Sequence, residues 1–186
     1  GVLLVMLSEF LLAFRMESQS AVLKKAFSSY VEPKIVNQII KNRHAVTLSG
    51  EQREISILFS DIRGFTSISE QLPPEQLVHL LNTYLAPMSH LVFKHHGLLD
   101  KYIGDAIMAL FNTPLPLDHF EDSACQCALD MLDSLVEVNQ KLVVDALPEI
   151  SIGIGIHTGI ATVGNIGSDV KFDYTAIGDA VNLSSR

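Results

Sequence analysis

The segment 99–111 constrains the fold most, because it consists of two apolar runs separated by a Gly-Asp pair. Glycine accepts the positive φ that a tight hairpin turn requires, and aspartate tolerates it. Residues 103–106 are therefore predicted to form a two-residue turn between antiparallel strands. This places the carboxylate of Asp105 at the tip of the hairpin. A further strand is predicted at residues 54–60, with Asp61 at its carboxyl end.

If these strands are neighbours, the carboxylates of Asp61 and Asp105 lie side by side with their charges unpaired. Magnesium ions take oxygen ligands and keep part of their coordination shell for water and substrate phosphates. Two such ions can activate an attacking oxygen and stabilise a leaving one in phosphoryl transfer. The pair therefore fits one or two Mg²⁺ ions. Taken alone, two aspartates at strand ends serve equally well as exposed, turn-forming residues.

The order of the predicted elements indicates an α+β fold. Two segments carry apolar residues at helical spacing, and each is expected to pack one stripe against a sheet. The first stripe contains Leu77, Leu80, Leu81, Tyr84, Leu85, Met88, Leu91 and Val92, and the second Ala124, Ala128, Met131, Leu135, Val138 and Leu142. The order β-α-β-β-α-β is typical of the ferredoxin-like split βαβ arrangement, in which the first strand and the hairpin are central neighbours. This independently brings Asp61 near Asp105.

The strand predicted at 150–156 has one bulky and one bare face. Isoleucines alternate there with Ser151, Gly153 and Gly155, so a helix or another subunit can approach the bare face closely. One more strand is predicted at 172–177, followed by a helix that begins near Val181.

The charge balance argues against a nucleic-acid partner. The chain has 13 Lys and Arg against 21 Asp and Glu, for a net charge of −8, so it lacks the basic excess that neutralises phosphates. An anionic substrate would need a metal ion. The sequence also has no Gly-rich phosphate loop, no dinucleotide-binding turn and no Ser-His-Asp order of the known hydrolase types.

The predicted C-terminal helix carries Asn182 and Arg186 four residues apart. This spacing is expected to place an amide and a guanidinium on one helix face, directed at one point. The alternative for such a pair is surface capping.

Three motifs resemble the signatures of class III adenylate and guanylate cyclase catalytic domains. They are Phe-Ser-Asp-Ile-Arg-Gly-Phe-Thr at 59–66, Lys-Tyr-Ile-Gly-Asp at 101–105 and Tyr-Thr-Ala-Ile-Gly-Asp-Ala-Val-Asn-Leu-Ser-Ser-Arg at 174–186. The resemblance covers residues 50–186. It implies the ferredoxin-like, palm-like cyclase fold and conversion of ATP to 3′,5′-cyclic AMP and pyrophosphate.

The resemblance also implies roles for individual residues. Asp61 and Asp105 would hold two Mg²⁺ or Mn²⁺ ions, with help from the backbone carbonyl of Ile62. Lys101 and Thr175 match the pair that reads the adenine base. Guanylate cyclases of similar fold typically carry Glu and a small polar residue or Cys at those places.

Two further residues match the catalytic pair of the family. Asn182 would orient the ribose, and Arg186 would meet the charge that develops on the phosphate. Sites of this family lie at a dimer interface, so Lys101, Thr175, Asn182 and Arg186 would serve the metals of a partner chain. A symmetric homodimer would then hold two sites.

Two rival functions stay open. One is a guanylate cyclase, which Lys101 and Thr175 disfavour. The other is a catalytically silent cyclase-like regulatory domain, which the presence of every matching site residue disfavours.

The N-terminal part predicts attachment to a membrane. Residues 1–14 are almost wholly apolar and are followed by basic residues, which is typical of a cytoplasmic flank. A full span needs about 20 apolar residues, so we expect a truncated transmembrane helix or, alternatively, an apolar packing helix. Residues 15–49 are predicted to form a helical juxtamembrane linker, and the catalytic domain would be cytoplasmic.

The family carries a further phosphate-binding Lys and closing strands beyond the equivalent of Arg186. We therefore expect residues 50–186 to be a C-terminally incomplete domain that is weakly active or inactive, whereas the parent protein is active.

Overall fold

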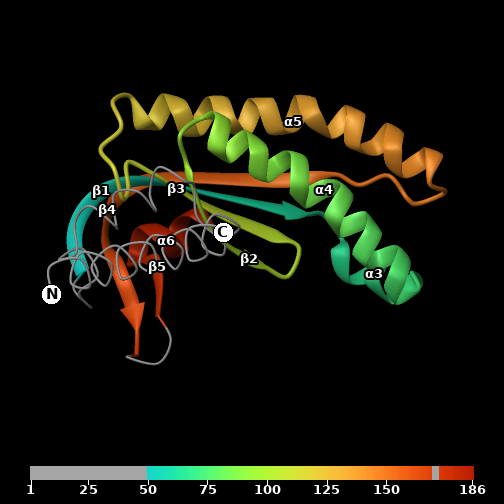
Figure 1. Ribbon diagram of the computed structural model, residues 1–186, viewed down its shortest axis with the longest axis horizontal. Helices are drawn as coiled ribbons and strands as arrows, with labels where there is room; N and C mark the ends of the chain where they lie inside the picture. Colours follow the sequence, from blue (N-terminus) through green and yellow to red (C-terminus); the bar gives the residue numbers. More distant parts are fainter. Residues whose placement is uncertain (1–49, 169–171) are drawn as a thin grey trace, which may run out of the picture. The chain divides into compact units, whose positions relative to one another are not determined.

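The described part of the chain is built on an antiparallel sheet with helices on both faces. The computed structural model describes residues 50–168 and 172–186. The sheet order is β2-β3-β1-β4-β5 (Figure 1). The strands are β1 (Gly50–Ile62), β2 (Leu98–Ile103), β3 (Ala106–Phe111), β4 (Ile152–Gly167) and β5 (Phe172–Ile177), and the helices are α3 (Phe65–Gln71), α4 (Pro74–Lys94), α5 (Phe120–Val144) and α6 (Asp179–Ser184).

The predicted split βαβ arrangement is present in this sheet. β3 lies between β1 and β2 and pairs with both in antiparallel register, and β4 covers the other side of β1. The hairpin has the predicted two-residue turn, because Ile103 pairs with Ala106. Gly104 adopts a φ of 66°. Asp105, the second central residue, has no positive φ, so the turn has the pattern of type II′, and glycine accepts its conformation without a steric cost. β5 adds a further strand beside β4, and α6 follows β5 in the chain.

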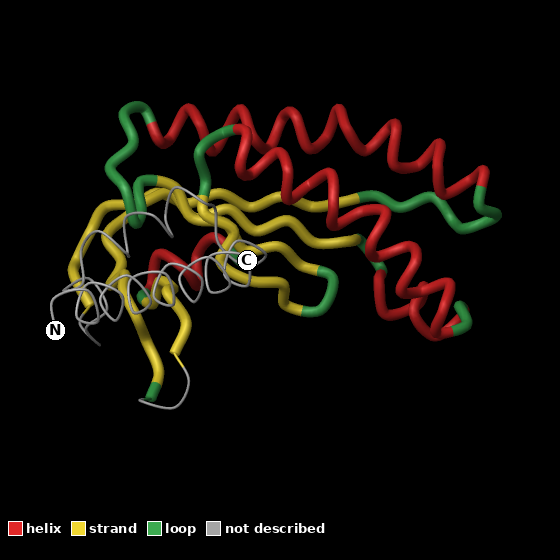
Figure 2. Tube along the Cα trace, viewed as in Figure 1, coloured by secondary structure: helices red, strands yellow, loops and turns green. Residues whose placement is uncertain are grey.

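The main hydrophobic core lies between the sheet and the two long helices. α4 and α5 lie side by side over one face of the sheet (Figures 1 and 2). Both predicted apolar stripes face this core. Its fully buried members include Leu80, Tyr84, Met88 and Val92 from α4, Cys127, Met131 and Leu142 from α5, and Leu58, Ile107 and Phe111 from the sheet. Residues spaced by four along α4 are buried together because they share one helix face.

The opposite face of the sheet carries the short helix α6, as the bare strand face predicted. A Cβ added to Gly155 in β4 would lie 2.2 Å from the backbone carbonyl oxygen of Ser184. Only a glycine fits at such a distance, so α6 can rest directly on the β4 backbone. The isoleucines that alternate with the glycines, Ile152, Ile154 and Ile156, pack against the core on the other face.

Several element boundaries differ from the predictions. β1 is longer than predicted and includes Asp61, because β4 pairs with it along its whole length. β4 begins at Ile152 and continues to Gly167, where it pairs with β5. α6 begins at Asp179 rather than near Val181.

The predicted membrane segment and linker, residues 1–14 and 15–49, lie outside the described residues. Within 50–168 and 172–186 no helix has the length and apolar character that a membrane crossing requires.

Candidate active site

The two predicted metal-binding carboxylates lie together at one end of the sheet. Asp61 is the penultimate residue of β1, and Asp105 follows Gly104 in the hairpin turn. The β1–β3 register, in which Ser60 pairs with Ile107, brings them close. The backbone N–H of Ile62 donates a hydrogen bond of 3.0 Å to Asp105 Oδ2. The predicted proximity of the two aspartates is thus confirmed.

The electrostatics of this pair fit a divalent cation. Burial and, next, the neighbouring Asp61 carboxylate raise the pKa of Asp105 to about 6. Two adjacent carboxylates favour any ligand that brings positive charge. Among residues 50–168 and 172–186 there is no group of three or more His, Cys, Asp or Glu suited to a metal. Water, backbone oxygen or substrate phosphates would have to complete the shell, which is the usual situation for Mg²⁺.

The observed contact of Ile62 with this pair is made by its amide N–H. Its carbonyl as a metal ligand stays a prediction.

A buried hydrogen bond lies close to the carboxylate pair. The hydroxyls of Ser60 and Tyr84 are 2.8 Å apart, and both side chains are buried. Burial raises the pKa of Tyr84 to about 12, and the charges of Asp105 and Asp61 act in the same direction. The sequence placed Tyr84 correctly in the apolar stripe of α4. It did not show that its polar end reaches β1 next to Asp61.

The two predicted base-reading residues, Lys101 and Thr175, meet at a third residue, Asp100. The Thr175 hydroxyl donates a hydrogen bond to Asp100 Oδ2. Lys101 Nζ lies 3.4 Å from Asp100 Oδ1, and the Asp100 side chain is fully buried. Burial raises the pKa of Asp100, whereas the hydrogen bond from Thr175 and the charge of Lys101 lower it. Sequence reasoning missed Asp100; the available signal was an acidic residue beside Lys101 in a mostly apolar strand.

The contact between Asp100 and Thr175 joins the two outer strands of the sheet. β2 and β5 stand at opposite ends of the strand order, yet this hydrogen bond connects them. The long strand β4 makes this possible, because it pairs with β1 over most of its length and with β5 only from Thr162 onward. In Figure 1, β1 and β4 curve strongly before β5 returns beneath the sheet.

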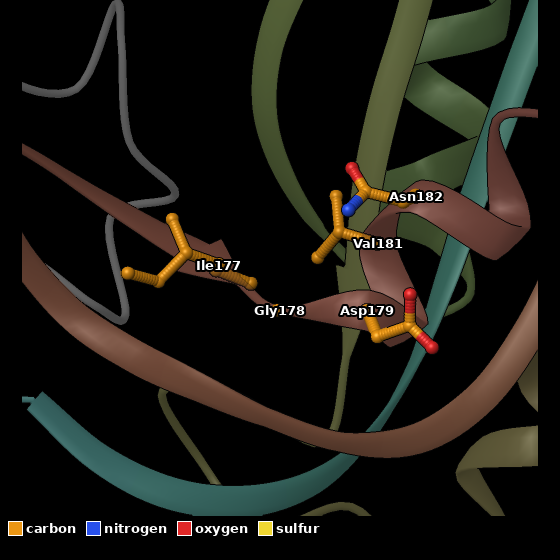
Figure 3. Close-up of a pocket in the computed structure, with 6 residues that line it drawn as sticks. Ile177, Gly178, Asp179, Val181 and Asn182 are labelled. Atoms are coloured by element: carbon orange, nitrogen blue, oxygen red, sulfur yellow. The ribbon is translucent and has the colours of Figure 1, made fainter.

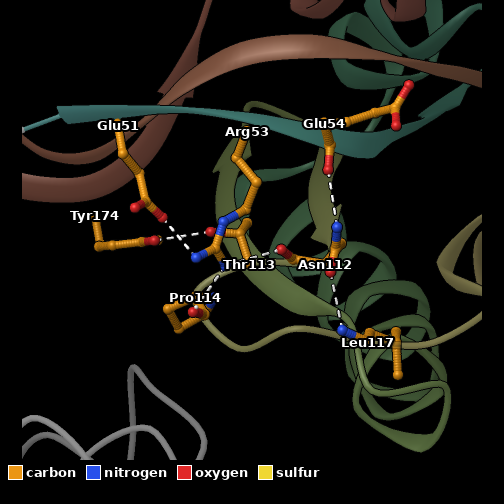
Figure 4. A network of polar contacts seen from close by, with 8 residues as sticks. All are labelled: Glu51, Arg53, Glu54, Asn112, Thr113, Pro114, Leu117 and Tyr174. Atoms are coloured by element: carbon orange, nitrogen blue, oxygen red, sulfur yellow. Dashed lines mark hydrogen bonds and ion pairs between the residues drawn. The ribbon is translucent and has the colours of Figure 1, made fainter.

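A second polar network holds β5 beside Thr175 (Figure 4). The hydroxyls of Tyr174 and Thr113 are 2.7 Å apart. Arg53 Nη1 donates hydrogen bonds to the carbonyl oxygens of Asn112 at 3.1 Å and Pro114 at 3.0 Å. These contacts connect β1, the segment after β3, and β5. They hold Tyr174, which directly precedes Thr175 in the chain.

Asn182 lines a pocket where β5 passes into α6 (Figure 3). The pocket residues are Ala176, Ile177, Gly178, Asp179, Val181 and Asn182. The predicted shared helix face of Asn182 and Arg186 is wrong. α6 ends at Ser184, and the backbone N–H of Arg186 donates to Leu183 O at 3.4 Å.

The last residues of α6 make local hydrogen bonds from side chain to backbone. Ser184 and Ser185 donate hydroxyl hydrogen bonds to the carbonyl oxygens of Val181, at 2.8 Å, and Asn182, at 3.1 Å. These hydroxyl hydrogen bonds accompany the last turn of α6.

Comparisons with known proteins agree on one family. Residues 48–186 match the family model described as "Adenylate and Guanylate cyclase catalytic domain". The chain is 44% identical over 138 residues to an adenylate cyclase of Anabaena cylindrica, covering 72% of this chain and 26% of that protein. It is 36% identical over 160 residues to adenylate cyclase 1 of Rhizobium meliloti (strain 1021), covering 86% of this chain and 24% of that protein. The chain thus spans about a quarter of the length of these curated relatives.

The fold of this chain is similar to solved structures of an adenylyl cyclase and of a guanylyl cyclase. The adenylyl cyclase CyaB from P. aeruginosa has a TM-score of 0.72 at 38% identity, covering 75% of this chain and 72% of that one. The guanylyl cyclase Cya2 has a TM-score of 0.72 at 41% identity, covering 74% of this chain and 70% of that one. Likeness of fold therefore does not decide between ATP and GTP, and the choice depends on the site.

Proposed function

Because the chain belongs to the adenylate and guanylate cyclase catalytic-domain family, we propose that the protein is an adenylate cyclase that converts ATP to 3′,5′-cyclic AMP and pyrophosphate. The observation that carries this proposal is the adjacency of Asp61 and Asp105 at the end of the sheet. A pair of adjacent carboxylates suits a substrate that arrives with metal ions.

In the proposed reaction the ribose 3′-hydroxyl gives its proton to solvent water, and its oxygen attacks the α-phosphorus. The bond from that phosphorus to the bridging oxygen breaks, and pyrophosphate leaves. Asp61 and Asp105 would hold Mg²⁺ or Mn²⁺, which when bound lowers the pKa of the 3′-hydroxyl and neutralises phosphate charge. Asn182 orients the ribose, and Arg186 offsets the negative charge that develops on the phosphate.

The choice of ATP over GTP is supported by the pair Lys101 and Thr175. A lysine ammonium is only a donor, and it fits adenine N1, which is an acceptor, but not the protonated N1 of guanine. A threonine hydroxyl can accept from the 6-amino group of adenine. The partly exposed Lys101 and the buried Thr175 lie within reach of one another through Asp100.

A homodimer is part of the proposal. Support comes from large apolar side chains that stay exposed on the hairpin, on β4 and β5, and on α6: Tyr102, Ile103, Ile160, Phe172, Ile177 and Leu183. These exposed apolar side chains are available for contact with a protein partner. A second copy of the chain would cover them and complete each site.

Two features rest on the sequence pattern alone. We propose that residues 1–14 attach the protein to a membrane and that the catalytic domain is cytoplasmic. Fractionation of membranes, with and without residues 1–14, tests this attachment.

The function is tested by measuring cyclic-nucleotide formation from ATP and from GTP with Mg²⁺ or Mn²⁺. The 186-residue chain and a version extended beyond Arg186 are assayed together, because the resemblance implies a further phosphate-binding Lys. Asp61→Ala removes one carboxylate of the pair, and Asp133→Ala, at an exposed position of α5, is the matched control.

The proposal predicts cyclic AMP from the extended version and from the Asp133→Ala control, and none from Asp61→Ala. Formation of cyclic GMP in place of cyclic AMP would make the protein a guanylate cyclase. No product from either nucleotide, in a protein shown to dimerise, would favour the silent regulatory domain.

A further inference from the structure

Asp100 occupies an unusual position for a carboxylate. Its side chain is fully buried, and it stands at a β-bulge, since the β2–β3 register shifts between Leu99 and Lys101. Oδ2 accepts the hydrogen bond from Thr175. Oδ1 has no hydrogen-bond partner among the described residues, although the ammonium of Lys101 lies 3.4 Å away. A buried carboxylate is costly, so its place between two residues proposed to read the base calls for a functional reason.

The hydrogen bond from Thr175 determines what that residue can offer to a ligand. A hydroxyl has one proton to donate and two lone pairs that accept. Because a carboxylate is only an acceptor, the Thr175 proton is committed to Asp100. The remaining polar capacity of Thr175 is that of an acceptor. The 6-amino group of adenine is a donor and matches it, whereas the 6-oxo group of guanine is an acceptor and does not.

We propose that Asp100 is a specificity-determining positioning residue that acts through Thr175: it holds the Thr175 hydroxyl as an acceptor and so selects a 6-amino over a 6-oxo purine nucleotide. This inference rests on the proposed cyclase function and on Thr175 facing the base. It adds a residue that touches no substrate itself. The Lys101 ammonium keeps the neighbouring position positively charged and thereby favours the carboxylate form of Asp100.

The substitution Asp100→Asn tests this role with almost no change of shape. The amide oxygen of the new side chain is expected to face the ammonium of Lys101, because an NH₂ group has no acceptor there. The NH₂ group then faces Thr175 and donates to it. The Thr175 proton is released and can donate to a 6-oxo group, so the polarity of the hydroxyl is reversed.

The experiment measures kcat/KM for ATP and for GTP in the active homodimer. If the 186-residue chain is inactive, a chain extended beyond Arg186 is used. The ratio of the two values is compared among the wild type, Asp100→Asn, Thr175→Val and the double variant. Asp130→Asn is the matched control, because Asp130 is likewise paired with a lysine, at 2.7 Å, but is only partly buried and lies on α5. A ratio is the chosen readout because loss of stability alone lowers both values together.

The expected result is a fall of about tenfold in the ATP to GTP ratio for Asp100→Asn, the discrimination that one hydrogen bond of about 1.4 kcal/mol supplies. The control should keep the wild-type ratio. In the Thr175→Val background, Asp100→Asn should change the ratio by less than about twofold, since the hydroxyl that it acts through is gone.

An unchanged ratio in a folded Asp100→Asn homodimer, or an equal fall in the Thr175→Val background, would overturn the inference but not the cyclase function. A wild type that makes no cyclic nucleotide would overturn both. If Asp100→Asn does not fold, a crystal structure of the wild type with a non-hydrolysable ATP analogue decides. Thr175 Oγ1 must then lie between Asp100 and the 6-amino group, and a Thr175 turned away from Asp100 would overturn the inference.

Discussion

The substitution Gly155→Ala is predicted to displace α6 and with it the proposed catalytic residues. A Cβ at position 155 would lie 2.2 Å from the carbonyl oxygen of Ser184, whereas tight but acceptable contacts begin at 3.0–3.4 Å. The obstacle is backbone and cannot rotate away. The helix must therefore retreat from β4 by roughly 1 Å to reach an ordinary van der Waals distance.

This displacement has two measurable consequences. Overpacking of this kind costs about 1–3 kcal/mol of stability. Replacing glycine inside a strand returns about 0.5–1 kcal/mol, because alanine loses less conformational freedom, so we expect a net loss of up to about 2.5 kcal/mol. Asn182 moves with α6, and a misplacement of about 1 Å can cost on the order of 100-fold in rate.

The assay combines urea unfolding with the rate of cyclic AMP formation. Gly153→Ala is the matched control, because it lies on the same face of β4 and the nearest atoms to its Cβ would be those of the Arg63 guanidinium, at 2.3 Å. Arg63 is an exposed residue with a flexible side chain that can move aside. We expect the control to keep its rate within about threefold. A Gly155→Ala protein with wild-type kcat, or a control that loses as much, would refute the claim that α6 is held in place by this contact.

Three further outcomes are expected from the contacts described above. Mg²⁺ should raise the melting temperature of the wild type but not of Asp61→Asn, because the variant loses half of the carboxylate pair; equal shifts by differential scanning fluorimetry would contradict this. Tyr84→Phe should cost about 1–3 kcal/mol in urea unfolding, since the buried Ser60 hydroxyl loses its partner, and a smaller loss would show that water replaces it. The Lys94 ammonium holds the pKa of Asp130 below its usual range, so the stability that this carboxylate contributes is present above pH of about 4 and lost as the pH falls. The Asp130→Asn protein should therefore have a flatter stability profile than the wild type below that pH, and parallel profiles would argue against the ion pair.

The parts of the fold that the sequence predicted well are those where a local pattern has one physical solution. The Gly104-Asp105 turn, the apolar stripes of α4 and α5 and the bare face of β4 each follow from side-chain periodicity or backbone freedom. The element order then placed β1 beside the hairpin, and this was enough to bring Asp61 to Asp105.

What the sequence did not predict depends on contacts between residues far apart in the chain. The hydrogen bond between Tyr84 and Ser60 spans 24 residues, and the one from Thr175 to Asp100 spans 75. No periodicity encodes them. The end of α6 was missed for a different reason: serines at 184 and 185 are compatible with a helix, and only the backbone hydrogen bond from Arg186 to the Leu183 carbonyl oxygen shows that Arg186 lies outside it.

The bulge at Asp100 shows how a single irregularity serves the core and the site together. In a regular strand, residues two apart share a face, so Leu99 and Lys101 would point the same way. In the observed register Leu99 pairs with Ala109 and packs toward the core under α4 and α5, while Lys101 pairs with Met108. Met108 and Ala109 are consecutive in β3 and face opposite sides of the sheet. The extra residue thus buries Leu99 without burying a lysine, and it leaves Lys101 on the face that carries α6.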